Sequence, residues 1–351
     1  LKRVMLCIDN GKLSSALSTN AFNLANSFGA EVVGIHGYNA QMHEGAFRVM
    51  EPTLPSEYQQ EEVLQKQRSV HNELIKLGME KISLSYLKPY EEFFQGLGVS
   101  YRMRVEEGKN YRAVGSLIRQ EKGDMVVIGA NGFNGNSKGY LGSVCLRVVR
   151  QNDIDTLVVK KGFNRTEKPR YVVGLDGSAC ALDALKSAKL FASKYNAEIH
   201  MVYVFDSHLH KDIFNTLKEA VISKEGFNFN TKEQEKMHDM FIDKGLAKVG
   251  QMILERAQLD VFAENVRAMD GFSLVGKDSV VPIETRILEG HVYKEICNYA
   301  EQIFADMIFV GRTGRHYVDG MGLGSTTENV LRYSPCDVFI KKNKEYKGWE
   351  L

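Results

Sequence analysis

Residues 124–143 read DMVVIGANGFNGNSKGYLGS, and residues 306–325 read DMIFVGRTGRHYVDGMGLGS. Each stretch begins with Asp, continues as an apolar run, and then carries glycines at one spacing, G-x2-G-x9-G, followed by Ser. A pattern that recurs in this way indicates an internal repeat. The chain is therefore predicted to consist of two similar halves.

The repeat extends to both sides of these two stretches. Each half opens with an apolar run that ends in Asp, RVMLCID at 3–9 and RYVVGLD at 170–176, and each closes with a similar segment, DTLVVKK and DVFIKKN. The closing segments lie farther apart than the opening ones, so the second half carries a longer insertion, at about 206–257. A short polar segment, GFNRTEKP, is typical of a turn or linker. The predicted domains are residues 1–161 and 170–344, joined by a linker at 162–169.

Short apolar runs without polar alternation predict strands that are buried on both faces. The predicted strands are 3–9, 31–38, 99–105, 125–129 and 155–160 in the first half, and 170–176, 197–205, 281–288, 306–311 and 337–342 in the second. Amphipathic segments lie between them, with long polar helices expected at about 56–78 and 231–257. Alternation of strands and helices predicts an α/β fold, a doubly wound parallel sheet in each half.

Composition limits the classes of function. The 351 residues are 44% hydrophobic, which is enough for two cores, and 45 Lys+Arg against 44 Asp+Glu give no basic surface for nucleic acid. No apolar stretch approaches the roughly 18–20 residues of a membrane span, and the opening LKRVMLCID is typical of a strand rather than a signal peptide. The five cysteines are scattered, without a C-x-x-C pair, which is typical of reduced thiols in a cytoplasmic protein.

The glycines after the fourth predicted strand are candidate phosphate-binding residues. They are Gly129, Gly132 and Gly142, followed by Ser143, and Gly311, Gly314 and Gly324, followed by Ser325. Glycine lets backbone N–H groups approach a phosphate closely, and the Gly-Ser step opens a helix whose N-terminus favours an anion. The alternative is that Gly-Ser only caps the helix.

Two aspartates end the first predicted strands, Asp9 and Asp176. In doubly wound sheets, ligands bind at the carboxyl ends of the strands where the strand order reverses. An Asp at that place can accept a hydrogen bond from an exocyclic amine or a ribose hydroxyl. Alternatively, each Asp caps the helix that follows it.

The sequence resembles the universal stress protein family over nearly all of both halves. The resemblance rests on Asp176-Gly177-Ser178, on Glu289-Gly290, and on DMIFVG-x2-G-x9-GS at 306–325. It implies a tandem universal stress protein with two flavodoxin-like (adenine nucleotide alpha hydrolase-like) sheets of about five strands each. It also implies a role in stress survival, ATP bound at the glycine loop in many members, and pairing of the two domains through their last strands, with a homodimer as a further possibility.

The resemblance also implies roles for individual residues. In the second half it places Asp176 beside adenine or ribose, the backbone around Val204 at adenine, and six residues along ribose and phosphates, with Mg²⁺ as a candidate companion: Gly311, Gly314, Gly324, Ser325, Thr326 and Thr327. The corresponding residues of the first half are Asp9, Gly37, Gly129, Gly132, Gly142 and Ser143.

The two halves differ at these places. Thr327 has Cys145 as its counterpart, and a thiol is a poor phosphate ligand. The loop of the second half carries Arg312 and Arg315 where the first has Ala130 and Phe133; the first has Lys138, and its opening, Asp9-Asn10-Gly11-Lys12, departs from Asp-Gly-Ser. We therefore expect ATP to bind best in the second half.

Three alternatives stay open. The halves could form a dimeric scaffold without a nucleotide. An enzyme is disfavoured because the chain lacks H-x-G-H, S-G-G-x-D-S and G-x4-G-K-[ST], so we expect slow ATP hydrolysis at most. The inserted segments could line a small-ligand or metal site, or form an amphipathic helix over the sheet; their residues are Met42, His43, Phe47, Met50, His208, His210 and Phe214. The spacing His208-x-His210 alone is too common to indicate a metal.

Overall fold

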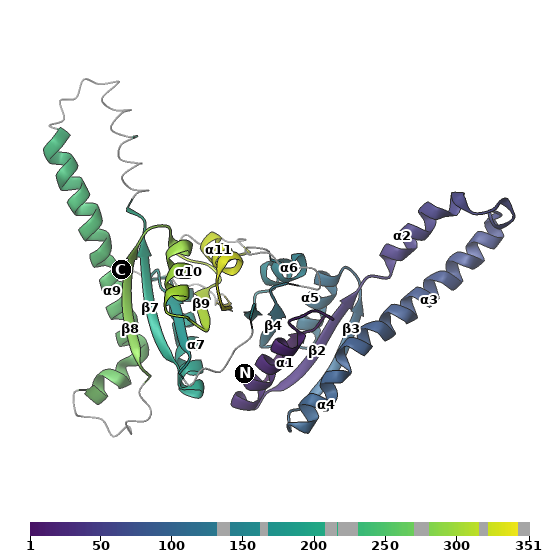
Figure 1. The fold of residues 1–351 in the computed structure, drawn as a ribbon, viewed down its shortest axis with the longest axis horizontal. Helices are drawn as coiled ribbons and strands as arrows, with labels where there is room; N and C mark the ends of the chain where they lie inside the picture. Colours follow the sequence, from purple (N-terminus) through teal and green to yellow (C-terminus); the bar gives the residue numbers. More distant parts are fainter. Residues whose placement is uncertain are drawn as a thin grey trace. The chain divides into compact units, whose positions relative to one another are not determined.

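The computed structural model describes residues 1–131, 141–161, 168–207, 216, 231–269, 281–315 and 322–342. The chain divides into two compact units, Leu1–Phe163 and Asn164–Leu351. Each unit contains one parallel sheet with helices packed against it (Figure 1).

The first unit has strands in the order β3-β2-β1-β4-β5. Their bounds are β1 Arg3–Cys7, β2 Glu31–Tyr38, β3 Tyr101–Glu107, β4 Met125–Gly129 and β5 Asp155–Val159. The helices are α1 Ser14–Phe28, α2 Gln41–Met50, α3 Glu61–Leu87, α4 Pro89–Gly96, α5 Asn110–Gln120 and α6 Ser143–Gln151, with 3₁₀ turns at Glu51–Thr53 and Ser56–Tyr58.

The second unit repeats this order as β8-β7-β6-β9-β10. Its strands are β6 Arg170–Gly174, β7 Glu198–Phe205, β8 Ile283–Glu289, β9 Met307–Gly311 and β10 Asp337–Lys341. Its described helices are α7 Ala179–Tyr195, α9 Thr231–Met269, α10 Val292–Gln302 and α11 Ser325–Tyr333.

The prediction of a doubly wound parallel sheet in each half is confirmed, and the strand order adds detail. Each sheet has the 3-2-1-4-5 order of the first five strands of a dinucleotide-binding sheet, whereas flavodoxin has 2-1-3-4-5. The order reverses between the first and fourth strands, β1 and β4 or β6 and β9. The crevice at the carboxyl ends of these strands therefore adjoins the first strand, as expected.

The central strands form the core because helices cover both of their faces. Val4, Met5 and Leu6 of β1, like Val172 and Val173 of β6, are fully buried. In the second unit α7 and α9 contact the sheet on the side away from α10 and α11, as α1 and α3 do relative to α5 and α6 in the first. This double cover explains why the strands read as continuous apolar runs.

The two long helices extend farther than the sequence pattern predicted. The first, α3, covers Glu61–Leu87 instead of about 56–78, and the second, α9, runs from Thr231 to Met269 with a non-helical residue at Phe262. In Figure 1, α2 and the start of α3 reach beyond the end of the sheet of their unit. A helix segment that does not pack on the sheet does not need a regular apolar stripe, so periodicity does not predict where such a helix ends. Within the described ranges, no helix has the length and apolar character needed to cross a membrane.

Candidate functional site

A cavity of about 450 Å³ lies at the carboxyl ends of β6, β7 and β9 in the second unit. The sequence-predicted residues of this half all line it: Asp176, Val204, Gly311, Gly314, Gly324, Ser325, Thr326 and Thr327. It opens where the strand order reverses, because β6 and β9 send the chain to opposite faces of the sheet.

The glycine loop after β9 is held at both ends by backbone hydrogen bonds. The Arg312 N–H donates to the Lys341 carbonyl at 2.8 Å, and the Gly324 N–H donates back to the Arg312 carbonyl at 2.9 Å. The first bond of helix α11 follows, from the Glu328 N–H to the Gly324 carbonyl at 2.9 Å. The loop therefore returns the chain to the strand end and fixes where α11 begins.

Three backbone N–H groups at the start of α11 lie at one end of the cavity. The amides of Ser325, Thr326 and Thr327 donate to no acceptor among the described residues, and Gly324 adds no side-chain cap. The first N–H groups of a helix carry the positive end of its dipole. These three donors, which face a cavity, can bind a phosphate group.

The hydroxyl of Thr327 is already engaged. It donates to the Gly311 carbonyl at 2.7 Å, and the residue is 5% exposed. Its single proton is therefore used within the protein, and its backbone N–H is the donor left for an anion. Ser325 is exposed at the helix start, and its hydroxyl is available to a ligand.

The carboxylate of Asp176 joins the end of β6 to the glycine loop. Its Oδ1 accepts from the Ser178 N–H at 2.9 Å, and its Oδ2 accepts from the Arg315 N–H at 3.1 Å. Ser178, not Asp176, caps α7, because its Oγ accepts from the Ala181 N–H at 3.2 Å. The Asp-cap alternative therefore does not hold for α7, and the carboxylate shapes the wall of the cavity.

Two of the glycines are required by close packing within the protein. A Cβ at Gly314 would lie 2.5 Å from the Asp176 Oδ2. A Cβ at Gly311 would lie 2.9 Å from the carbonyl carbon of Cys180 and 3.0 Å from the Ala181 nitrogen. Close approach of the loop to Asp176 and of α7 to β9 thus accounts for both glycines without a ligand.

The backbone of Val204 faces the cavity with unused hydrogen-bonding groups. The last bond of β7 on the β6 side runs from the Leu175 N–H to the Val202 carbonyl at 2.9 Å, whereas Phe205 accepts from Gly290 on the β8 side at 2.9 Å. Alternate residues of a central parallel strand bond to opposite neighbours, so Val204, like Val202, faces the β6 side. There β6 has ended, and no described group bonds to the Val204 N–H or carbonyl.

Apolar side chains that the sequence analysis did not identify complete the wall: Tyr203, Leu246, Val292 and Ile296. Leu246 comes from the inserted helix α9. Gly250 lets this helix pack closely on β7, since a Cβ at Gly250 would lie 2.2 Å from the Tyr203 ring. Burial raises the pKa of Tyr203, so its phenol stays neutral. No motif marks these residues, because their proximity depends on how α9 and α10 cross the sheet.

Of the two arginines predicted in the loop, one reaches the cavity. Arg315 lines it, whereas Arg312 is 3% exposed and lies outside the lining. Of these two arginines, Arg315 is therefore the one whose cationic side chain can contact a phosphate in the cavity.

The first unit repeats the backbone frame of this loop. The Ala130 N–H donates to Val159 at 2.8 Å, Gly142 donates back to Ala130 at 2.7 Å, and Leu146 donates to Gly142 at 3.0 Å as α6 begins at Ser143. Gly129 ends β4. Gly132, Phe133 and Lys138 lie outside the described residues.

Other parts of the first unit differ from the second. The Asp9 Oδ1 accepts from the Gly11 N–H at 2.9 Å, which matches the turn at Asp176. Gly37 occupies the place of Val204 on β2, but Ala113 and Asn110 crowd it, each with an atom 2.8 Å from a Cβ built there. Cys145, at the place of Thr327, is 3% exposed, and burial raises its pKa to about 12, so it stays a neutral thiol.

The described part of the inserted segments packs as an amphipathic helix. Phe47 of α2 stacks on His71 of α3 with ring centroids 4.4 Å apart, while Met42 and Met50 are 65% and 55% exposed. His43 is exposed as well. The matching residues of the second half, His208, His210 and Phe214, lie outside the described residues.

Comparison with known proteins identifies the relatives of this architecture. The sequence model of the universal stress protein family matches residues 1–160 and again 169–342. A universal stress protein of Methanocaldococcus jannaschii is 26% identical over 185 residues, which cover 53% of this chain and 87% of the relative. A putative universal stress protein of Staphylococcus aureus is 33% identical over 86 residues, which cover 24% of this chain and 51% of the relative.

Solved structures extend the similarity to both units. A universal stress protein from Archaeoglobus fulgidus covers 97% of this chain and 98% of its own, with a TM-score of 0.57 and 19% identity. A putative universal stress protein from Pseudomonas aeruginosa covers 97% of this chain and 93% of its own, also with a TM-score of 0.57, at 14% identity. At these identities the structural matches establish the fold.

Proposed function

The chain belongs to the universal stress protein family, and we propose that its second unit binds an adenine nucleotide, ATP first among them, in the cavity between β6, β7 and β9. One observation carries this proposal. A single cavity of about 450 Å³ has unused backbone groups at Val204 and unused N–H donors at the start of α11. Cavities of about 300–1,000 Å³ are typical of small-molecule sites.

The Val204 end suits the base. One residue offers an N–H donor and a carbonyl acceptor side by side, and adenine presents an exocyclic amine donor beside ring nitrogen acceptors. The apolar side chains of Tyr203, Leu246 and Ile296 supply a surface for the ring faces. These contacts select a flat base with an amino edge.

The α11 end suits the phosphates. The backbone N–H groups of Ser325, Thr326 and Thr327 supply donors, and Arg315 supplies the nearby cationic side chain. Asp176 lies between the two ends, where a ribose hydroxyl can donate to its carboxylate. Mg²⁺ would enter with the phosphates, since it binds through phosphate oxygens, water and one or two carboxylates.

The cavity favours a nucleotide-dependent regulator over an efficient enzyme. Its two carboxylates are engaged: Asp176 accepts from two backbone N–H groups, and Asp206 pairs with the His291 Nδ1 at 2.9 Å. Because both carboxylates already have partners within the protein, we expect slow ATP hydrolysis at most. Location in the cytoplasm, pairing of the two units through their last strands and a homodimer stay predictions.

The nucleotide content of the purified chain tests the proposal. Denatured protein would be analysed by ion-exchange chromatography for the parent, for Gly324→Val and for the matched control Gly142→Val. A Cβ at Gly324 would lie 3.3 Å from the Arg312 carbonyl oxygen, a tight contact, and 3.5 Å from the Thr313 Cα, so the valine adds bulk against the glycine loop at the start of α11. We expect nearly one equivalent of adenine nucleotide in the parent and in Gly142→Val, and its loss in Gly324→Val.

Two results would contradict the proposal. Retention of the nucleotide by Gly324→Val would place the site elsewhere. Absence of nucleotide, together with no thermal shift on addition of Mg-ATP, would favour the alternative of a scaffold that acts through protein contacts.

A further inference from the structure

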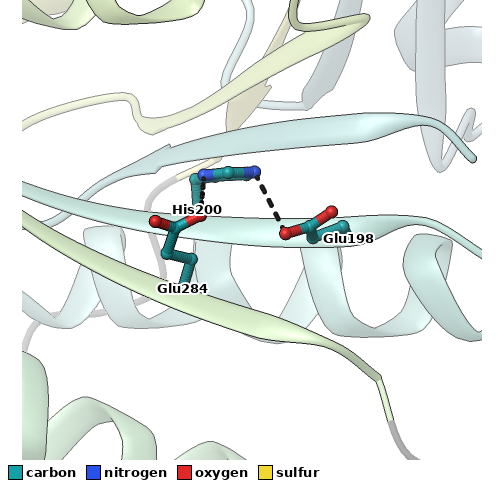
Figure 2. A group of neighbouring side chains, drawn as sticks. All are labelled: Glu198, His200 and Glu284. Carbon is teal, nitrogen blue, oxygen red and sulfur yellow. Dashed lines mark ion pairs between the residues drawn. The ribbon is translucent and has the colours of Figure 1, made fainter. Parts of the chain in front are cut away.

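Three ionisable side chains meet on the sheet of the second unit, away from the cavity. Glu198 and His200 lie on β7, and Glu284 lies beside His200 on β8. Residues two apart on a strand share a face, so the register places all three together. One potential ligand atom from each lies within 4.8 Å of the others, and Figure 2 shows the two carboxylates each beside a different nitrogen of the imidazole ring.

His200 is buried and incompletely bonded. It is 4% exposed; its Nδ1 lies 2.8 Å from the Tyr299 hydroxyl and 3.3 Å from the Glu284 Oε2. Its Nε2 is 3.6 Å from the Glu198 Oε1 and has no hydrogen-bond partner. A neutral imidazole carries its proton on one ring nitrogen and a lone pair on the other. With that proton on Nδ1, a bare lone pair at Nε2 faces a carboxylate oxygen.

In the first unit, an arginine joins the acidic side chains at the corresponding position. There Glu31 matches Glu198, Val33 matches His200 and Arg102 matches Glu284, by the same register. The Arg102 guanidinium lies 3.4 Å from Glu31 and 2.6 Å from Glu121, so it is the central cation of that network.

In the second unit, the carboxylate of Glu284 occupies the position of the Arg102 guanidinium. The Glu284 Oε1 contacts Arg286, while its Oε2 faces His200. Among the described residues Glu198 has no arginine partner, whereas its counterpart Glu31 has both Arg3 and Arg102. An imidazole and two carboxylates thus lie within 4.8 Å of one another without the guanidinium that joins the acids of the first unit.

We propose that Glu198, His200 and Glu284 form a binding site for a divalent transition-metal ion, with Zn²⁺ as the best-suited ion. Zinc binds His nitrogen and carboxylate oxygen at about 2.0–2.2 Å, which sets tetrahedral ligands about 3.4 Å apart. The observed 3.6 Å between Nε2 and Oε1 is close to this separation. The Glu284 Oε2 lies 3.3 Å from the other ring nitrogen, Nδ1, so the partly exposed Glu284 side chain would turn to bring its carboxylate to an ion at Nε2.

The surroundings fit a metal-binding histidine. The Tyr299 hydroxyl at Nδ1 orients the ring and leaves Nε2 for the ion, as hydrogen-bond partners of ligating histidines do. The side chains of Glu198 and Glu284 are 29% and 34% exposed, so an ion can enter from solvent and keep a water as its fourth ligand. This set of one imidazole and two carboxylates suits zinc-class ions better than Mg²⁺, which prefers oxygen alone.

The metal site is separate from the proposed nucleotide site. Glu198 begins β7 and Val204 lies near its end, about 20 Å apart at the 3.3 Å rise of a strand residue. The metal ion would therefore bind without a nucleotide, and its absence would leave the nucleotide proposal untouched.

Zinc titration of the full chain tests this proposal. Chain stripped with EDTA and freed of nucleotide would be titrated with Zn²⁺ by calorimetry, for the parent, His200→Val, Glu198→Gln, Tyr299→Phe and the control His291→Gln. Valine is the residue of the first unit at this place, and His291 is an exposed histidine at the other end of β8. We expect one zinc ion per parent chain, an affinity at least about a hundredfold lower without His200 or Glu198, and a roughly ten- to hundredfold loss in Tyr299→Phe.

A second measurement separates this site from the cysteines. The Co²⁺-loaded parent should give a visible spectrum of nitrogen and oxygen ligands without a thiolate charge-transfer band, and Glu198→Gln should abolish it. Glu198 is partly exposed, so this variant decides the question even if His200→Val does not fold. The proposal is overturned if the parent binds no Zn²⁺, if both ligand variants bind it like the parent, or if the Co²⁺ spectrum is that of a thiolate.

Discussion

The loops after β4 and β9 have the same backbone frame and different side chains. Gly142 donates to the Ala130 carbonyl at 2.7 Å, and Gly324 donates to the Arg312 carbonyl at 2.9 Å, before a helix begins at the next residue. The residue three positions after each glycine is buried Cys145 in one unit and Thr327 in the other. The frame is thus a property of the repeated fold, and the proposed difference in nucleotide binding rests on the side chains that each unit adds to it.

The second strand of each unit, β2 or β7, differs in the same way. Both β2 and β7 extend beyond the end of the neighbouring first strand, β1 or β6. Past the last backbone bond to that neighbour, one residue of each strand still faces its side: Gly37 of β2 or Val204 of β7. In the second unit this residue lines a cavity, whereas Ala113 and Asn110 press close to Gly37 in the first. The repeated topology therefore places the matching backbone groups beside a cavity in one unit and against α5 in the other.

The largest effect expected from this comparison concerns Gly311 and Gly129. Gly311→Ala puts a Cβ 2.9–3.0 Å from backbone atoms of Cys180 and Ala181, so we expect a loss of about 1–3 kcal/mol in the free energy of unfolding. Gly129→Ala meets nothing closer than 3.4 Å and should change it by less than about 0.5 kcal/mol. Urea unfolding of both variants measures the difference; equal effects would contradict the packing explanation for Gly311.

An intermediate effect is expected from exchanging the two buried residues after the loops. Thr327→Cys removes the hydroxyl that donates to the Gly311 carbonyl at 2.7 Å and leaves a weak thiol donor, which should cost about 1–2 kcal/mol of stability. Cys145→Thr adds a hydroxyl near the matching carbonyl and should change stability less. Thermal unfolding of the two variants checks this, and a neutral Thr327→Cys would show that the hydroxyl is not structural.

Much of this comparison could be made from the sequence. The apolar runs predicted all ten strands, with ends that differ by three residues or fewer from those observed, because strands covered on both faces carry an unbroken apolar signal. The glycine spacing located the loops. The ends of α3 and α9 were not predictable, since these helices leave the sheet and lose their apolar periodicity.

The site was predictable in its backbone elements and less so in its side chains. Eight predicted residues line the cavity, but the bonds from Asp176 to the Arg315 N–H and from Thr327 to Gly311 depend on loop geometry that no pattern encodes. Leu246 and the cluster around His200 were missed for a related reason. Their neighbours come from distant segments, and a single histidine in an apolar strand gives no signal of its own.

The smallest effect concerns the ionic network that only the first unit has in this form. Hydrogen bonds from Arg102, and then Arg104, lower the pKa of Glu121, whose counterpart at the end of α10 is Ile303. A carboxyl with a lowered pKa stabilises the fold above its unfolded pKa of about 4.3, and this contribution is lost as the pH falls through the folded pKa. Both arginines are partly exposed, so the contribution should stay below about 1 kcal/mol.

Glu121→Gln tests this expectation. Between pH 6 and pH 3 the variant should lose less stability than the parent, as followed by urea unfolding at each pH. Ile303→Gln is the matched control in the second unit and should leave the pH dependence unchanged. A parallel pH dependence of parent and Glu121→Gln would mean that other carboxyls dominate the acid response.

The central claim is that the second unit binds the nucleotide with its base at Val204 and its phosphates at the start of α11. A crystal structure of the full chain grown with a non-hydrolysable Mg-ATP analogue tests it most directly. The account predicts the adenine edge bonded to the Val204 backbone, the terminal phosphates at the N–H groups of Ser325, Thr326 and Thr327, and higher occupancy than in the first unit. Nucleotide bound only in the first unit, or phosphates held away from α11, would contradict it.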